Sequence, residues 1–206
     1  MSAPFHYPMQ SMTSMKERLS WNCFIRKKVA DGIKMKKTLI TVEINEKPME
    51  LAVTETSTVS DVLHNTLGLT GTKVCCGLGI CKACTYIFTS PKEPDFQKAQ
   101  ACLMPMVQMN GCKLTTIEGL AKNGVLTPLQ KSFLTHFSFQ CGYSTAGFLM
   151  SATHLLQHIQ KNPIKIDDID KEIEKAVGDH FCRCTGYKKY YEAIREVLVV
   201  HCVSPA

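Results

Sequence analysis

The residues best suited to metal chemistry in this 206-residue chain are its eleven cysteines, most of which lie in two groups. In the first group, Cys76, Cys81 and Cys84 have the spacing C-x₄-C-x₂-C, and Cys102 follows eighteen residues later. Thiolates at such short spacing can converge on one metal centre, and this pattern is that of plant-type [2Fe–2S] sites. We therefore predict a [2Fe–2S] cluster on these four residues.

The loop between the first two of these cysteines contains Gly77 and Gly79. Glycine tolerates positive φ, so the backbone can fold closely over a cluster and donate N–H groups to its sulfurs. The main alternative is a structural zinc site, but zinc usually takes two ligand pairs such as C-x₂-C twice. Cys75 is interpreted as a packing residue, and it is the rival ligand if Cys76 does not bind.

The second group joins two segments far apart in the sequence. Cys141 lies in the segment from Gln140 to Gly147, and Cys182 and Cys184 form a C-x-C pair about forty residues later. Both segments fall between predicted helices, so two turns at one end of a bundle could bring three thiols together. A C-x-C pair is hard to explain as core packing, because its two side chains need not face the same way.

The first half of the chain reads as a small α+β domain over residues 38–119. Apolar residues alternate from Ile40 to Ile44 and again from Met49 to Val53, which predicts a hairpin. Thr58, three residues before Asp61, predicts a capped helix that ends at Gly68. Further strands are expected at Thr85–Thr89 and Lys113–Ile117.

Residues 120–206 have helical periodicity and read as an all-α domain of four helices. The predicted helices begin near Thr127, Thr145, Asp167 and Tyr187. Their expected apolar faces contain Leu129, Phe133, Leu134 and Phe137 in the first; Phe148, Leu149, Ala152, Leu155, Leu156 and Ile159 in the second; Ile169, Ile173 and Val177 in the third; and Tyr191, Ile194, Val197 and Leu198 in the fourth.

Composition and charge narrow the class of protein. Hydrophobic residues make up 45% of the chain and charged residues 20%, as in globular proteins. Residues 1–37 carry the whole net charge of +6 as a basic extension, so the balanced body favours no nucleic-acid partner. We expect no membrane span and no secretory signal. A cytoplasmic location follows, where cysteines bind metal more often than they form disulfides.

The chain closely resembles the iron–sulfur subunit of the molybdenum hydroxylases, the xanthine dehydrogenase, aldehyde oxidase and carbon monoxide dehydrogenase family. The resemblance runs from about Thr38 to Val200. It rests on four segments: Lys73–Thr85, Thr116–Leu120, Gln140–Gly147 and Cys182–Tyr187. It implies a β-grasp, plant-type ferredoxin-like domain followed by a four-helix domain, each with one [2Fe–2S] cluster.

The resemblance also implies partners. A separate large subunit would hold molybdopterin, with Gln140 touching the pterin and Cys184 close to it. A flavin (FAD) or haem-containing cytochrome subunit would lie towards the first cluster. This chain would then be the electron-transfer part of an oxidoreductase, with no catalytic residues and no substrate-binding centre of its own.

Ser144 departs from the family pattern, which has cysteine at this position. The second site therefore has Cys141, Cys182 and Cys184 but no fourth thiolate where one is expected. Ser144 could bind iron as an alkoxide, a harder ligand than thiolate. Alternatively, Cys23, Cys112 or Cys202 could substitute, or the second cluster could be absent. We favour Ser144 ligation or an altered cluster over loss.

Two other functions stay open on the sequence alone. One is a free-standing ferredoxin-like carrier or redox sensor that uses only the first cluster. The other is a metal-stabilised assembly or scaffold protein whose basic extension recruits a partner.

Overall fold

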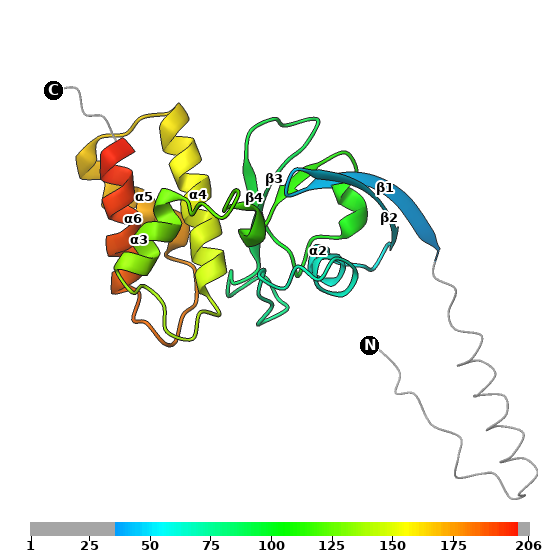
Figure 1. Cartoon of the computed structure of the whole chain (residues 1–206), viewed down its shortest axis with the longest axis horizontal. Helices are drawn as coiled ribbons and strands as arrows, with labels where there is room; N and C mark the ends of the chain where they lie inside the picture. The colour runs from blue at the N-terminus through cyan, green and yellow to red at the C-terminus, as the bar shows by residue number, and fades with distance from the viewer. Residues whose placement is uncertain (1–35, 202–206) are drawn as a thin grey trace, which may run out of the picture. The chain divides into compact units, whose positions relative to one another are not determined.

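The structure is a computed structural model that describes residues 36–201. The basic extension predicted for residues 1–37 lies outside the described residues, apart from Lys36 and Lys37. The described chain contains a small mixed sheet followed by a helical half (Figure 1). The strands are β1 (Lys37–Ile44), β2 (Lys47–Thr54), β3 (Thr85–Thr89), β4 (Gln97–Gln100) and β5 (Lys113–Thr115).

The five strands form one sheet in the order β2-β1-β5-β3-β4. The central pair β1 and β5 is parallel, and the other three pairs are antiparallel. The chain therefore leaves the sheet after β2 and returns to it at β3. The Cys-rich loop lies in that connection, between a short helical segment and β3.

The predicted hairpin is confirmed, with a two-residue turn at Asn45 and Glu46. Both residues have positive φ, 51° and 67°, which is the geometry of a type I′ turn that matches the twist of the strands. The Asn45 side chain also accepts a hydrogen bond from the Thr116 backbone N–H and donates one to the Thr116 hydroxyl, both at 2.9 Å. The turn is thus tied to the chain that leaves β5.

The predicted helix after Thr58 begins as expected but changes type. Thr58 and Asp61 form the capping box of α2 (Val59–Asp61), and a π-helical turn η2 (Val62–Thr66) follows at once. Gly68, at φ 68°, ends the segment. Val59 and Leu63 are fully buried in the hydrophobic core of the sheet half. The predicted apolar face is therefore present, although the helix is irregular.

The strand β4 was not predicted. Its sequence, Gln97-Lys98-Ala99-Gln100, has no apolar alternation, and all four residues are half-buried. It lies at the edge of the sheet and is held by backbone pairing to β3. Prediction of strands from alternating apolar and polar residues does not detect such an edge strand.

The helical half contains α3 (Pro128–Thr135), α4 (Thr145–Lys161), α5 (Ile169–Val177) and α6 (Lys188–His201). The bounds of α4 agree with the prediction from its apolar face and from Pro163. Short 3₁₀ segments η3 (Met106–Met109), η4 (Ile117–Gly119) and η5 (Ile166–Asp168) complete the described elements.

Part of the predicted apolar face of α3 is wrong. Leu134 and Phe137 are expected to be buried, but they are 48% and 73% exposed. Because α3 ends at Thr135, Phe137 lies beyond the helix at positive φ. In α6, the predicted Tyr191 is half-buried and packs against the helical core, and Tyr190, which was not predicted, is fully buried in it.

The two halves pack through α4, which lies beside β3 and β4 and between the sheet and the other helices (Figure 1). Ile87 of β3 belongs to the apolar core of the helical half. Gly147 permits this approach, because a Cβ atom there would lie 2.3 Å from the Lys82 carbonyl oxygen. The helix therefore comes into backbone contact with the Cys-rich loop.

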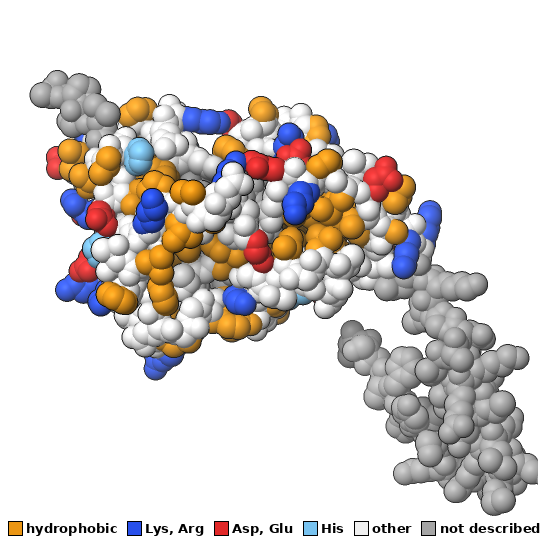
Figure 2. All heavy atoms as spheres, in the orientation of Figure 1, with side chains coloured by type: hydrophobic (Ala, Val, Ile, Leu, Met, Phe, Trp, Pro, Cys, Tyr) orange, Lys and Arg blue, Asp and Glu red, His pale blue; other side chains and the backbone are white. Residues whose placement is uncertain are grey.

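The charges of the described part are mixed. On the face seen in Figure 2, Lys and Arg side chains lie among Asp and Glu side chains, without a continuous basic surface. None of the helices between residues 36 and 201 is both long and apolar enough to cross a membrane.

Candidate metal centres

The Cys76 and Cys81 thiols form the first pair in the Cys-rich loop. The titration of Cys76 is affected by the Cys81 thiol, and the Leu78 backbone N–H donates to the Cys76 sulfur at 3.3 Å. Gly77 and Gly79 have φ of 66° and 70°, as this tight loop requires. Donation from the Cys81 and Leu78 backbone N–H groups lowers the pKa of Cys76 to about 6, which favours a thiolate.

The Cys84 and Cys102 thiols form a second pair, in which Cys102 affects the pKa of Cys84. Cys84 directly precedes β3, and Cys102 follows β4, so the pairing of these two strands brings the thiols together. Burial raises the pKa of Cys84 to about 12 and also raises that of Cys81. The four predicted residues of the first site thus meet in two pairs.

Pairing in twos suits a binuclear cluster. A [2Fe–2S] cluster with four cysteines carries two thiolates on each iron, whereas structural zinc draws four ligands to one ion. The arrangement at the first site therefore fits a [2Fe–2S] cluster better than it fits zinc.

Cys75 does not pack as expected. Its side chain is exposed, and the partner of Cys81 is the Cys76 thiol. The loop also exposes two large apolar side chains, Leu78 at 67% and Ile80 at 68%, and Leu103 beside Gly79 is 53% exposed. We call these three exposed side chains, Leu78, Ile80 and Leu103, the apolar rim of the first site.

The second site begins with a contact between the two predicted inter-helix segments. The Cys141 and Cys184 sulfurs lie 3.5 Å apart, and both residues are exposed. Gly142 precedes α4 with φ 78°, and Gly186 precedes α6 with φ 64°, so both loops turn sharply at this end of the bundle. Gln140, next to Cys141, is exposed.

Cys182 and Ser144 form the inner pair of this site. Cys182 is 7% exposed and Ser144 8%, and hydrogen bonding from Ser144 helps to lower the pKa of Cys182. Thr185 donates to the same sulfur at 3.2 Å. Burial alone would raise the pKa of Cys182, but these hydrogen bonds and those from backbone N–H groups outweigh it, and the pKa is lowered.

The second site therefore repeats the two-pair arrangement, with one oxygen in place of a sulfur. Cys141 pairs with Cys184 at the surface, and Cys182 pairs with Ser144 inside. Of the three substitute cysteines considered above, Cys112 is buried in the core of the sheet half. Cys23 and Cys202 lie outside the described residues.

Ser144 has a further neighbour that sequence reasoning missed. Its hydroxyl oxygen lies 3.4 Å from the Tyr190 hydroxyl, which also bonds the Thr145 hydroxyl at 2.9 Å. Burial raises the pKa of Tyr190, so the phenol stays protonated. Tyr190 and Tyr191 are adjacent in the sequence. The contact could have been predicted only by knowing which of the two lies on the face of α6 that packs against the core.

The two sites are joined by a backbone hydrogen bond. The Phe181 N–H donates to the Cys81 carbonyl oxygen at 3.1 Å. Lys82 and Asp179 add an ion pair at 3.5 Å next to it. The segment that leads into Cys182 is thus fastened directly to the loop of the first site.

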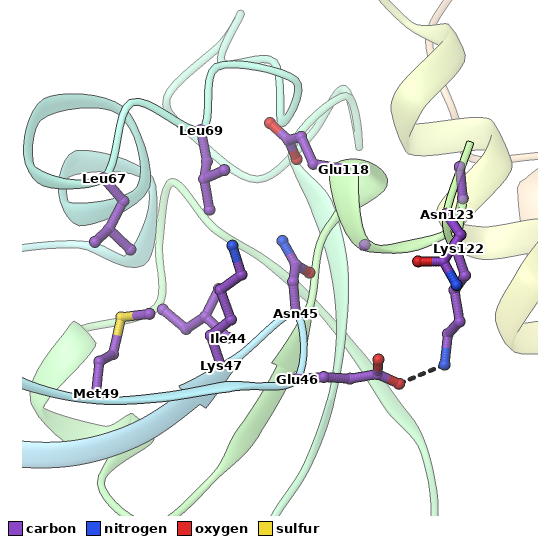
Figure 3. Close-up of a pocket in the computed structure, with 12 residues that line it drawn as sticks. Ile44, Asn45, Glu46, Lys47, Met49, Leu67, Leu69, Glu118, Lys122 and Asn123 are labelled. Carbon is purple, nitrogen blue, oxygen red and sulfur yellow. Dashed lines mark hydrogen bonds and ion pairs between the residues drawn. The ribbon is translucent and has the colours of Figure 1, made fainter.

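A separate pocket of about 600 Å³ lies at the β1–β2 turn, away from these sites (Figure 3). Leu67, Met49 and Ile44 line one side, and Glu46 and Lys122 form an ion pair on the other. Its described lining contains no cysteine or histidine. Neither cysteine group lines this pocket.

Comparisons with known proteins agree with the paired sites. Residues 42–107 match the family described as 2Fe-2S iron-sulfur cluster binding domain, and residues 116–195 match the family described as [2Fe-2S] binding domain. The small subunit of nicotine 6-hydroxylase from Paenarthrobacter nicotinovorans is 39% identical over 155 residues, which are 75% of this chain and 86% of that subunit.

Two further relatives extend the comparison. Caffeine dehydrogenase subunit gamma from Pseudomonas sp. (strain CBB1) is 37% identical over 164 residues, 79% of this chain and 92% of that subunit. The crystal structure of quinoline 2-oxidoreductase from Pseudomonas putida 86 contains a chain with a TM-score of 0.68 and 34% identity, covering 78% of this chain and 92% of that one.

The fold and the paired sites define a protein with two [2Fe–2S] domains. The chain belongs to the family of iron–sulfur (small) subunits of the molybdenum hydroxylases. It is an electron-transfer subunit of an oxidoreductase complex, and its cofactors are [2Fe–2S] clusters.

Proposed function

We propose that the chain consists of a β-grasp, ferredoxin-like domain over residues 38–119 and a four-helix domain over residues 120–206. The parallel pairing of β1 with β5 inside an otherwise antiparallel sheet supports the first assignment. The four helices α3 to α6, with their shared apolar core, support the second. The two matched sequence families, over residues 42–107 and 116–195, change over near this boundary.

The ligands of the first cluster are Cys76 and Cys81 on one iron and Cys84 and Cys102 on the other. Their contacts in two thiol pairs carry this proposal. The backbone N–H of Leu78 stabilises negative charge on the Cys76 sulfur. Cys75 points to solvent and takes no part.

The ligands of the second cluster are Cys141 and Cys184 on the outer iron and Cys182 with Ser144 on the inner iron. The burial of Ser144 beside Cys182 and its effect on the pKa of that thiol support this assignment. Ligation by Ser144 requires that its hydroxyl proton leave to solvent, so that the oxygen binds as an alkoxide. Thr185 is then free to stabilise the Cys182 thiolate.

When bound, each cluster takes up and releases one electron at a time, and the protein sets the direction of flow by burial and hydrogen bonding. The exposed Cys141–Cys184 end, with Gln140 and Cys184, would face a molybdopterin on a separate large subunit. The Phe181–Cys81 hydrogen bond would connect the two sites. The apolar rim of Leu78 and Ile80 would face a flavin or cytochrome subunit.

No residue of this chain acts on substrate in this proposal. The exposed Leu78, Ile80 and Leu103 around one site and the exposed Phe181 and Tyr143 around the other support contacts with partner subunits. The body carries no continuous basic surface on the viewed face, which supports protein partners over nucleic acid. None of the nine described cysteines forms a disulfide, which fits the proposed reducing, cytoplasmic location.

Copurification tests the proposed assembly. We expect the full chain to elute with a large subunit in a fixed ratio, with molybdenum in the same fractions. A monomeric chain that carries iron but never associates with a molybdenum-containing subunit would contradict the proposal and favour a free-standing ferredoxin-like carrier.

A further inference from the structure

Tyr190 lies at the start of α6 with its ring fully buried between two aromatic neighbours. It stacks on Phe148, with ring centres 4.1 Å apart and planes 10° apart, and meets Phe133 edge-on at 5.4 Å. These contacts leave the ring little freedom to move. They aim its hydroxyl at the start of α4, at Ser144 and Thr145.

The three hydroxyls form a short chain that ends at the second site. Thr145 and Tyr190 are 2.9 Å apart, and Tyr190 and Ser144 are 3.4 Å apart. A tyrosine hydroxyl has one proton to donate, and Thr145 can donate its own proton to the tyrosine oxygen. Tyr190 can then direct its proton to the Ser144 oxygen.

An alkoxide ligand needs such a donor. A buried charged oxygen without a hydrogen bond is costly, and a hydrogen bond to a charged acceptor is stronger than one between neutral groups. Serine also reaches less far than cysteine, because a C–O bond is shorter than a C–S bond. A fixed donor would compensate for this shorter reach by holding the serine oxygen in place at the second site.

We infer that Tyr190 is a positioning residue for the second cluster: its hydroxyl, backed by Thr145, donates to the Ser144 oxygen and holds it beside Cys182. This inference rests on the proposed ligation by Ser144. It explains why a phenol, and not an aliphatic side chain, occupies this buried place between Phe148 and Phe133.

The test compares two adjacent tyrosines on the same helix. Tyr190→Phe removes only the oxygen next to Ser144, whereas Tyr191→Phe removes a surface hydroxyl that bonds Glu174 at 2.6 Å. Both variants are made in the full chain within its complex. Iron per chain, the EPR spectrum after reduction and the rate of iron loss to a chelator are measured for each.

We expect Tyr190→Phe to shift the EPR signal of the second cluster and to speed its iron loss about tenfold, as loss of an outer hydrogen-bond partner does at other metal sites. Tyr191→Phe should match the wild type in both measurements. Thr145→Val should shift the same signal in the same direction by a smaller amount, because it removes the second hydroxyl of the chain.

Combining Tyr190→Phe with Ser144→Cys distinguishes a positioning role of the Tyr190 hydroxyl from a role in packing alone. In Ser144→Cys the acceptor oxygen is gone, so adding Tyr190→Phe should leave the signal of that variant unchanged. If Tyr190→Phe has the same effect in both backgrounds, or none in the wild type, the positioning role is wrong. A wild-type chain with about two irons and one signal would instead overturn ligation by Ser144 itself.

Discussion

The Cys81 carbonyl oxygen accepts a hydrogen bond from the Phe181 backbone N–H at 3.1 Å. One of these residues is a proposed ligand of the first cluster, and the other directly precedes Cys182, a proposed ligand of the second. A route of a few covalent bonds and this single hydrogen bond therefore connects the two sites. The same contact fixes how the helical half meets the Cys-rich loop.

Removing this N–H should slow electron transfer between the sites. Phe181→Pro lacks the donor, and the lost hydrogen bond should cost about 1 kcal/mol of stability. Reduction of the first cluster by electrons that enter at the second should slow in a stopped-flow experiment. Phe181→Ala keeps the N–H and serves as control, and equal rates in the two variants would exclude this route.

The first site is tested by two cysteines in the same loop. Cys84→Ala should remove about two irons per chain and the first EPR signal, because it leaves one iron short of a thiolate. Cys75→Ala should change neither quantity, since the Cys75 side chain is exposed. Retention of the first signal in Cys84→Ala would show that another residue binds.

Gly147 should tolerate no side chain. A Cβ atom in Gly147→Ala would meet the Lys82 carbonyl oxygen and the Ala83 backbone, which cannot move away as a flexible side chain could. We expect a loss of about 1–3 kcal/mol in the free energy of unfolding, measured by thermal or denaturant unfolding. A variant as stable as the wild type would mean that α4 does not approach the loop this closely.

Much of the fold could be predicted from the sequence because local chemistry specifies it. The Thr58–Asp61 capping box, the Asn45–Glu46 turn and the bounds of α4 each depend on a few neighbouring residues. The edge strand β4 could not be predicted, because backbone pairing holds it and its side chains show no pattern.

The candidate sites also contain features that the sequence predicts and features that it does not. Spacing indicated the thiols of the first site, and the placement of two segments between predicted helices indicated that Cys141 meets the C-x-C pair. The contacts of Ser144 with Cys182 and Tyr190 depend on how two helices far apart in the sequence are aligned. A shift of one residue in the phase of α6 would exchange Tyr190 for Tyr191, and no local pattern distinguishes them.

Acid should weaken the fold through His154. Burial lowers the pKa of His154 below its ordinary value, and the Phe96 carbonyl holds its ring at 3.0 Å. The unfolded chain therefore takes up a proton that the folded chain resists, so stability should fall as pH drops below about 6.5. Lys98 and His158, both nearby, oppose the added charge further.

His154→Gln keeps a side-chain donor but cannot titrate, so its unfolding midpoint should fall less between pH 7.5 and pH 5.5 than that of the wild type. His158→Gln, on the same helix, is the control. Parallel midpoint curves for the wild type and His154→Gln would contradict this role.

Iron and acid-labile sulfide analysis, combined with EPR of the reduced complex, tests the central claim most directly. We predict about four irons per chain and two distinct signals. Ser144→Cys should retune the second signal and leave the first unchanged. About two irons per chain, one signal and no response to Ser144→Cys would contradict a relay through two clusters.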